Sequence, residues 1–188
     1  DIVLIEPPGG AQFRSMPPTT GETDQGLYFW YTNVNKRSAT LDLNQEHDRI
    51  AFLNLVERAD VILDPFPPGY LAALGLSDET LFAANRNLVL LSLTGFGQTG
   101  PFRDYASSDI VGMAMGGMMS LTGDPSREPL TPPAWQCYQV SSLWATIAVQ
   151  AAVYRRIKTG QGARIDMSLQ EAAFDMSETA HTFYLCNG

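Results

Sequence analysis

Apolar residues in this chain gather in short runs that alternate with longer stretches of helical spacing. The most apolar run covers residues 87–94 and is nearly unbroken, which is typical of a parallel strand covered on both faces. Short apolar runs at 2–5 and 61–63 and mixed segments at 39–43 and 164–168 predict four more strands. Because helical segments separate these strands, the pattern indicates an α/β fold with a mainly parallel sheet.

Helical spacing is clearest in residues 141–158, where Leu143 and Ile147 begin an apolar face and cations gather at the C-terminal end. Ser168 and Glu171 predict a capping box that starts a final helix. Other predicted elements are helices at 44–58, 78–84 and 109–121, a single turn at 71–74, and a loop with exposed aromatic side chains at 11–30.

Three turns rich in glycine or proline follow predicted strands, at residues 6–10, 64–69 and 95–101. Ligands of open α/β sheets bind outside the carboxyl ends of the strands, and glycines there let a ligand approach the backbone. We therefore expect the three turns to lie along one edge of the sheet. The third turn could equally be a plain strand-to-loop connection, and its spacing matches neither the dinucleotide fingerprint nor a Walker loop.

Composition and charge limit the kinds of molecule that this chain is expected to bind. The chain has 188 residues and a net charge of -8, which argues against nucleic-acid binding because that needs a large positive face. A nucleotide-like ligand needs only a few cations, and residues 35–38 (Asn-Lys-Arg-Ser) could either hold its phosphates or form a solvated turn. No apolar run has the length of a membrane span and no signal-peptide pattern is seen, so we expect no membrane association.

Potential reactive side chains are few. Cys137 and Cys186 are expected to be reduced thiols of a cytoplasmic protein. His47 and His181 lack neighbours at metal-ligand spacing, so no metal site is predicted. The methionines of residues 113–119 are interpreted as flexible core packing, with a methionine-lined acyl pocket as the alternative.

Six motifs follow one another in order along nearly the whole chain. They are I-V-L-I-E-P-P-G-G at 2–10, N-K-R-S-A-T-L-D-L at 35–43, A-D-V with F-P-P-G and L-G-L between 59 and 76, L-T-G-F-G-Q-T-G-P at 93–101, Asp109 with S-L-T-G at 120–123, and K-T-G-Q-G with D-M-S-L between 158 and 169. Together they resemble the family III coenzyme A (CoA) transferases, a group that includes formyl-CoA transferase, carnitine CoA-transferase and α-methylacyl-CoA racemase.

The resemblance implies a Rossmann-like, mainly parallel sheet flanked by helices. Family members are roughly twice this length, begin with a strand and helix ahead of the E-P-P-G strand, and continue into a smaller domain. Residues 1–188 would then be a single domain, most of the family's large domain, with an incomplete sheet and with the N-terminal strand and helix and the C-terminal domain absent. The family forms interlocked dimers, so the expected partner is a second family III chain, identical or related.

The resemblance also implies the substrates, an acyl-CoA and a carboxylic acid, with CoA as substrate and no metal. The CoA-binding positions would be Phe66, Pro68, Gly69, Leu71, Leu74, Thr94, Gly95, Phe96 and Gly97. The pantetheine arm would run toward the start of the long helix. Pro65 and Ala73 stand where the family has a CoA-contacting Asn and Arg.

In the transferases an Asp just before the long helix attacks the thioester to give an acyl-enzyme anhydride. The resemblance places that position at or near Tyr138, and residues 135–139 contain no carboxylate. A phenol, with a pKa of about 10, is a poor substitute. The racemases use a His–Asp pair, and Ser108 stands where their His would be, so the racemase alternative is disfavoured.

Two hypotheses remain for the activity of this chain. It could be an active transferase whose carboxylate is Asp124 or Glu128, in the loop before the long helix. It could instead be a catalytically silent structural or CoA-binding partner, the subunit or half of an enzyme whose other chain carries the Asp. We favour the second hypothesis.

Overall fold

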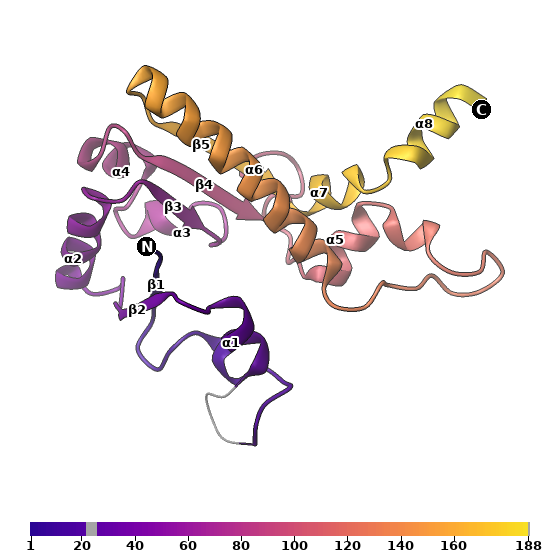
Figure 1. Ribbon diagram of the computed structural model, residues 1–188, viewed down its shortest axis with the longest axis horizontal. Coiled ribbons are helices and arrows are strands. Elements are labelled where there is room, and N and C mark those ends of the chain that lie inside the picture. Colours follow the sequence, from indigo (N-terminus) through magenta and orange to yellow (C-terminus); the bar gives the residue numbers. More distant parts are fainter. Residues whose placement is uncertain (22–25, 188) are drawn as a thin grey trace. The chain divides into compact units, whose positions relative to one another are not determined.

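The computed structural model describes residues 1–21 and 26–187. The chain divides into two compact units, Asp1–Leu55 and Val56–Gly188. Figure 1 labels the helices and strands of both units. Within the described residues, no helix is long and apolar enough to cross a membrane.

The first unit contains a two-stranded parallel sheet. Strand β1 (Val3–Glu6) pairs with β2 (Arg37–Thr40). The 3-10 helix η1 (Gln12–Ser15) and helix α1 (Leu27–Thr32) lie between them in sequence, and helix α2 (Glu46–Val56) follows. Strand β2 begins two residues before the predicted segment 39–43, because its pairing partner β1 is only four residues long and aligns Val3 with Arg37.

The predicted loop at 11–30 is wrong at its C-terminal end. The aromatic segment beginning at Leu27 forms α1 and buries Phe29 to 8% exposure, while Trp30 stays half exposed. The guanidinium of Arg14 lies 4.2 Å from the centre of the Phe29 ring. Burial of one aromatic face therefore outweighs the turn-forming residues that surround it.

The second unit contains a three-stranded parallel sheet in the order β3-β4-β5. The strands are β3 (Val61–Asp64), β4 (Val89–Thr94) and β5 (Ala163–Ser168). In the central strand β4, four consecutive residues from Val89 to Ser92 are buried. Successive side chains point to opposite faces, so both faces of β4 are covered, and the predicted parallel, doubly covered strand is confirmed.

The prediction that three turns line one sheet edge holds for two of them. The turns after β3 and β4 share the carboxyl edge of the second unit's sheet, because these strands are parallel neighbours. The turn that contains Gly9 follows β1 instead, and β1 pairs with β2 in a separate sheet. The expectation of a single sheet is thus corrected to two sheets among the described strands.

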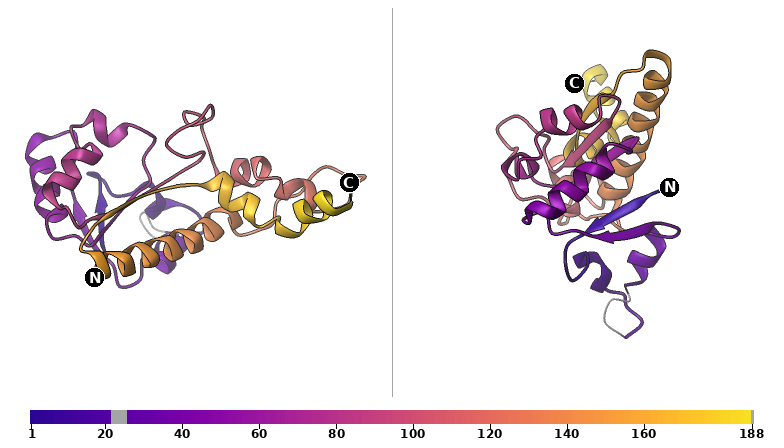
Figure 2. Two further views of the ribbon diagram at one scale, coloured as in Figure 1. Left: turned by 90° about the horizontal axis from the view of Figure 1, so that it is seen from above. Right: turned by 90° about the vertical axis from the view of Figure 1, so that its left-hand side faces the viewer.

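The orientation of helix α6 (Gln136–Thr159) follows from its last turns. The guanidinium of Arg156 donates to the carbonyl oxygens of Asp60 and Asn87, 3.0 and 3.4 Å away, just before β3 and β4 begin. The C-terminal end of α6 therefore lies at the amino edge of the sheet, and its N-terminal end lies toward the carboxyl edge. Figure 2 shows α6 as one long continuous helix.

The predicted helix at 109–121 is shorter in the structure. Helix α5 (Asp109–Met115) ends at Gly116, and the 3-10 helix η2 (Met118–Leu121) follows after Gly117, whose φ is +84°. A Cβ on Gly116 would lie 2.5 Å from the Cβ of Ala173. Close approach of α5 to α7 (Leu169–Asp175) therefore requires glycine here and breaks the helix.

A small apolar cluster joins α5, α6 and α7. Its buried members are Met113, Cys137, Leu169 and Ala173, with Met118 and Met119 packed against it. The core-packing interpretation therefore holds for these three methionines but not for Met115, which is 42% exposed. The N-cap half of the predicted capping box is confirmed, since Ser168 Oγ accepts from Glu171 N–H at 3.0 Å, while the Glu171 carboxylate accepts from the Ser168 hydroxyl at 2.7 Å. The remaining helices are α3 (Tyr70–Ala73), α4 (Asp78–Ala84) and α8 (Glu178–Asn187).

Candidate functional site

The half-buried carboxylate of Asp64 connects the turn after β3 to the neighbouring strand β4. Asp64 Oδ1 accepts from Phe66 N–H at 3.0 Å, and Oδ2 accepts from Ser92 Oγ on β4 at 2.9 Å. Burial raises the pKa of Asp64 above its usual range, and these hydrogen bonds oppose the rise. The Phe66 ring stacks on Tyr70 at 4.7 Å between centroids, and both rings are more than a third exposed.

The turn after β4 contains polar atoms without partners. Thr94 is 7% exposed, and its Oγ1 has no hydrogen-bond partner among the described residues; the same is true of Gln98 Nε2. Gly97 has φ +83°, and the next N–H, that of Gln98, donates to both carboxylate oxygens of Asp166 on β5. Burying a hydroxyl without a hydrogen-bond partner destabilises the fold. A ligand that formed a hydrogen bond with it would offset that cost, so we regard this turn as a candidate ligand contact.

Two contacts join the β4 turn to the start of α6. The carbonyl of Gly95 accepts from Gln170 N–H at 3.2 Å, at the beginning of α7. The carbonyl of Leu169 accepts from the thiol of Cys137, the second residue of α6, at 3.4 Å. The candidate nucleotide turn and the N-terminal end of α6, where Tyr138 is 41% exposed, therefore belong to one region of the second unit.

A model of the family described as CoA-transferase family III matches residues 1–188, the whole sequence. The chain belongs to CoA-transferase family III. It is 38% identical over 169 residues to the acetyl-CoA:oxalate CoA-transferase of Acetobacter aceti, covering 89% of this chain and 43% of that relative. It is 32% identical to the succinyl-CoA:(R)-benzylsuccinate CoA-transferase subunit BbsE of Thauera aromatica, covering 100% of this chain and 47% of that one.

A solved structure shares the fold. The CAIB/BAIF family protein from Brucella suis matches with a TM-score of 0.94 at 36% identity, over 100% of this chain and 50% of that one. The family III chain described here therefore spans about half the length of the curated relatives it matches. The family resemblance read from the six motifs is confirmed.

The backbone just before Tyr138, the predicted nucleophile position, is strained. Ala134 and Trp135 have φ of +66° and +51°, and Trp135 is the residue that immediately precedes α6. The side-chain amide of Gln139 donates to the carbonyl of Ala134, and that of Gln136 donates to Pro133. Left-handed backbone at two consecutive side-chain-bearing residues is uncommon and tends to occur at functional sites.

One carboxylate lies beside Tyr138 that its place in the sequence does not predict. Asp109, at the start of α5, is 9% exposed, and its Oδ1 accepts from Tyr138 N–H at 3.1 Å. It supplies the cap that Trp135 does not provide, because no side-chain cap hydrogen bond comes from that residue. No local pattern in the sequence indicates that a residue 29 positions away caps this helix.

The buried thiol next to this position is not a nucleophile. Burial, and after it the charge of Asp109, raises the pKa of Cys137 to about 11. Burial also raises the pKa of the Tyr138 phenol. A Cβ on Gly112 would lie 2.5 Å from Cys137 Sγ, so the thiol packs directly against α5. Both groups therefore stay protonated near neutral pH.

The two carboxylates proposed from the sequence lie in an exposed loop. Asp124 Oδ1 accepts from the backbone N–H and the hydroxyl of Ser126, at 2.9 and 2.8 Å. The backbone bond and then the hydroxyl bond lower the pKa of Asp124. Asp124 thus caps a local turn, and Glu128 is exposed in the same loop.

Among the predicted CoA-binding residues, exposure differs. Leu71 is 8% exposed and lies in the core, Leu74 and Pro68 are half buried, and Phe66 and Gly69 are exposed. The structure therefore brings the Phe66–Gly69 turn to the carboxyl edge with the Thr94–Gly97 turn. Their contacts with CoA remain predictions.

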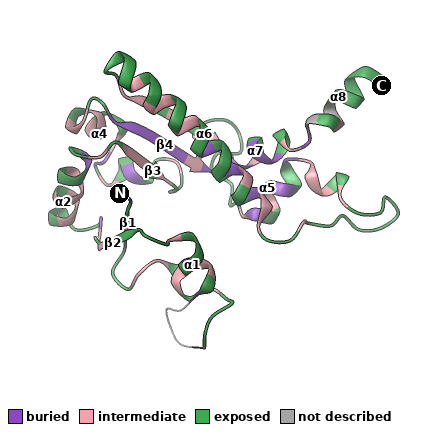
Figure 3. Cartoon of the chain, in the orientation of Figure 1, coloured by how far each residue is buried: buried purple, intermediate pink, exposed green. Residues whose placement is uncertain are grey.

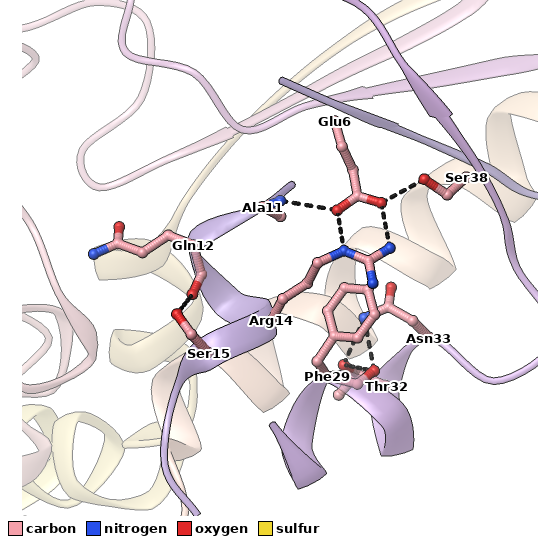
Figure 4. A network of polar contacts seen from close by, with 9 residues as sticks. All are labelled: Glu6, Ala11, Gln12, Arg14, Ser15, Phe29, Thr32, Asn33 and Ser38. Atoms are coloured by element: carbon pink, nitrogen blue, oxygen red, sulfur yellow. Dashed lines mark hydrogen bonds and ion pairs between the residues drawn. The ribbon is translucent and has the colours of Figure 1, made fainter. Parts of the chain in front are cut away.

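The first unit's turn is closed by its own ion pair (Figure 4). Glu6, 2% exposed, accepts two hydrogen bonds of 2.7 Å from Arg14, one of 2.8 Å from Ala11 N–H and one of 2.5 Å from Ser38 Oγ. The hydrogen bonds from Arg14 hold the pKa of Glu6 at about 2. The Glu6 carboxylate therefore stabilises the fold of this turn.

The cations of the 35–38 cluster have partners within the first unit. Lys36 Nζ donates to Asn33 Oδ1 at 3.0 Å, and Arg37 pairs with Asp1 at 3.1 Å, with both side chains of that pair largely exposed. Both contacts fit the solvated-turn interpretation of this cluster.

At the amino edge of the β3-β4-β5 sheet lies a hollow of about 410 Å³, lined by Arg58, Asp60, Asn85, Asn87 and Arg156 among others. It lies at the opposite edge from the candidate site. Arg156 is already paired with Asp60 there at 2.8 Å, and Asn85 donates to the carbonyls of Val56 and Ala59. We therefore interpret this edge as structural. No group of three or more potential metal ligands occurs among the described residues.

Proposed function

We propose that this family III chain is the CoA-binding half of a CoA-transferase and that it does not itself carry the nucleophile. The assembled enzyme would move CoA from an acyl-CoA to a free carboxylic acid. Two observations support the general reaction, namely the family membership and the transferase names of the relatives. The proposal that this chain binds CoA while another chain supplies the nucleophile depends on the residues at the start of α6.

The reaction needs a carboxylate that can be acylated. In the route that the family resemblance implies, an enzyme carboxylate attacks the thioester carbonyl, the C–S bond breaks, and CoA leaves as a thiolate. CoA thiolate then attacks the enzyme carbonyl of this anhydride, which releases the donor acid and leaves an enzyme–CoA thioester. The acceptor carboxylate attacks that thioester and displaces CoA thiolate, forming a second anhydride. CoA thiolate finally attacks the acceptor carbonyl of the second anhydride to give the product thioester and the free enzyme carboxylate. Every step requires that carboxylate to face the CoA sulfur.

One observation carries the proposal that this chain is silent. Tyr138 occupies the third residue of α6, with its backbone N–H bonded to the carboxylate of Asp109. Asp109 is nearly buried and acts as a helix cap, while Asp124 holds a turn in an exposed loop. Glu128 lies in the same exposed loop as Asp124. Since none of the three carboxylates is both unengaged and at the α6 position, the nucleophile is best supplied by a partner chain.

CoA binding itself would use the carboxyl edge of the second unit's sheet. The unpaired hydroxyl of Thr94 and the glycine backbone around Gly97 offer polar contacts for the phosphates or the pantetheine amides. The exposed Phe66 and Tyr70 rings offer a stacking surface for adenine. Stacking would then replace part of the affinity that the family gains from the Asn and Arg absent here.

The partner we propose is a family III chain that carries the Asp. One relative, from Thauera aromatica, is named as a subunit of its transferase, which fits an enzyme made of more than one kind of chain. We also propose a cytoplasmic location, since both Cys137 and Cys186 are free thiols.

Acyl-enzyme trapping tests the proposal. The full chain is incubated with succinyl-CoA or acetyl-CoA, alone and with an Asp-bearing family III chain, then treated with hydroxylamine and analysed by peptide mass spectrometry. We expect hydroxamate only when the second chain is present, and only on that chain. Hydroxamate on Asp109, Asp124 or Glu128 of the isolated chain would show instead that it is an active transferase.

CoA binding is measured separately by calorimetric titration of the isolated full chain. The proposal expects saturable binding of CoA and of desulfo-CoA, because the sulfur is not needed for recognition of the nucleotide. A chain that binds neither compound, alone or with its partner, would contradict a role as the CoA-binding half.

A further inference from the structure

The turn after β3 has few backbone donors with which it can be held in place. Its sequence at residues 64–69 is D-P-F-P-P-G, and its three prolines have no N–H group. Between residues 65 and 68 only Phe66 can donate a hydrogen bond from the backbone, and that N–H donates to Asp64 Oδ1 at 3.0 Å. The position of the Phe66 ring therefore depends on the Asp64 carboxylate.

The same carboxylate is fixed to the neighbouring strand. Asp64 is the last residue of β3 and aligns with Ser92 of β4, and the Ser92 hydroxyl donates to Asp64 Oδ2 at 2.9 Å. Ser92 is fully buried, and Figure 3 shows β4 buried along most of its length, with β3 less buried beside it. Asp64 therefore connects the buried central strand of this sheet to the exposed ring of Phe66, with one carboxylate oxygen for each contact.

The Phe66 ring is a part of this turn that a ligand can reach. It is 37% exposed and stacks on Tyr70, which is 38% exposed, with an angle of 28° between the ring planes. A base stacks more favourably on a ring whose orientation is already fixed, because a mobile ring loses conformational entropy on binding. The hydrogen bond from Phe66 to Asp64 therefore preorganises the surface proposed above for adenine.

The charges around Asp64 do little to stabilise its ionised form. Arg164 of β5 attracts this carboxylate and Asp78 of α4 repels it, and these two side chains pair with each other at 2.6 Å. Burial therefore raises the pKa of Asp64, although the hydrogen bonds from Phe66 and Ser92 and the attraction of Arg164 oppose the rise. The carboxyl group consequently takes up its proton at a higher pH than an ordinary aspartate does.

We infer that Asp64 is the positioning residue of this turn, because its ionised carboxylate holds the Phe66–Tyr70 ring pair in place for adenine and its protonated form releases that pair. A neutral carboxyl accepts a weaker hydrogen bond from Phe66 N–H, and its own proton must be donated to Ser92 Oγ, which reverses that bond. The inference rests on the proposed CoA site. It adds a residue that touches no ligand and a dependence of CoA affinity on pH.

Calorimetric titration of CoA into the full chain and into its Asp64→Asn variant tests the inference. Asparagine keeps the shape and an Oδ1 acceptor but has no charge, so it imitates the protonated carboxyl. CoA has titrating groups of its own, so the quantity to follow is the ratio of the variant Kd to the wild-type Kd. This ratio should be about ten at about pH 8 and should fall toward one as the pH is lowered toward about 5, through the titration of Asp64.

Two further variants should move the pH at which CoA affinity weakens, in opposite directions. Ser92→Ala removes a hydrogen bond to the ionised form, so its affinity should begin to fall at a higher pH than that of the wild type. Asp78→Asn removes a negative charge and frees Arg164 to attract Asp64, so its affinity should fall at a lower pH. The matched control is Asp60→Asn at the amino edge, 80% exposed, which should bind CoA like the wild type at every pH.

An amide spectrum separates this inference from the proposed function. In the ¹H–¹⁵N spectrum of the full chain without CoA, the Phe66 amide should shift with pH through one titration that Asp64→Asn lacks. This measurement needs no CoA, so it decides the contact between Asp64 and Phe66 even if the titrations refute the CoA site itself. A Phe66 amide that does not titrate, a Kd ratio that is constant with pH, or tighter CoA binding by Asp64→Asn would each overturn the inference.

Discussion

The turn after β1 and the turn after β4 are alike in outline, since each follows a strand and contains glycines with positive φ. In the first, both carboxylate oxygens of Glu6 accept hydrogen bonds from Arg14 (Figure 4). In the second, Thr94 Oγ1 and Gln98 Nε2 are buried without partners among the described residues. One turn satisfies its polar groups internally, and the other leaves donors and acceptors unused.

Because both turns contain glycines, glycine content does not distinguish a structural turn from a ligand-binding one. The pairing of the buried polar groups does. A turn whose buried groups are all paired is stabilised by its own contacts and offers a ligand little. A turn with unpaired buried groups is destabilised by their desolvation, and that cost is offset only when something binds. The comparison therefore predicts opposite effects of mutation, with large stability changes at Glu6 and large affinity changes at Thr94.

The largest effect is expected from Glu6→Gln. Glu6→Gln removes the charged acceptor of two Arg14 hydrogen bonds from a nearly buried ion pair, and the free energy of unfolding should fall by about 3 kcal/mol. Urea unfolding of the full chain, followed by tryptophan fluorescence, measures the change. Asp1→Asn breaks the largely exposed pair with Arg37 and should leave the unfolding midpoint almost unchanged. Equal effects of the two variants would refute the structural role of Glu6.

The same carboxylate makes stability depend on acid pH. The pKa of Glu6 is held at about 2, below its usual 4.5, so the ionised form favours the folded state. Its contribution is fully present above pH 4.5 and is lost as the pH falls toward 2, a total of about 3 kcal/mol. Glu6→Gln should remove this component from a plot of unfolding free energy against pH. A variant with the wild-type slope between pH 5 and 3 would contradict the assignment.

Much of the second unit could be predicted from its sequence, because its signals are local. The continuous apolar run 87–94 gave β4, the Ser168–Glu171 spacing gave a capping box, and the long apolar period gave α6. Where the pattern misled, a distant contact decides the structure. Helix α5 stops at Gly116 because α7 packs against it, and α1 forms because Phe29 finds Arg14.

The candidate site was less predictable for the same reason. The family resemblance predicted that the nucleophile position falls at or near Tyr138, where no carboxylate stands. It did not indicate that Asp109, 29 residues away, accepts a hydrogen bond from Tyr138 N–H. It also treated three turns as equivalent, although β1 pairs with β2 and only the other two turns share a sheet edge. Pairing between strands and hydrogen bonds across long separations depend on the whole fold.

A moderate effect is expected from Gly97→Ala in the β4 turn. The backbone there has φ +83°, so a Cβ adds strain of about 1 kcal/mol, while its nearest neighbour at 3.7 Å causes no clash. Gly100→Ala is the matched control, with φ +93° and nothing within 4 Å of the added carbon. Thermal unfolding should show similar losses for both variants, whereas CoA titration should show weaker binding only for Gly97→Ala. Equal CoA affinities would remove Gly97 from the site.

The smallest change in stability, and the most informative one, is expected from Thr94→Val. Valine keeps the shape and removes a buried hydroxyl that has no partner, so the unfolding free energy should stay within about 0.5 kcal/mol of wild type or rise. If that hydroxyl contacts CoA, affinity should fall by about tenfold, the equivalent of one hydrogen bond. Thr94→Ser keeps the hydroxyl and should bind CoA nearly as the wild type does. Wild-type affinity in Thr94→Val, together with a large loss of stability, would mean that the β4 turn is as purely structural as the turn at Glu6.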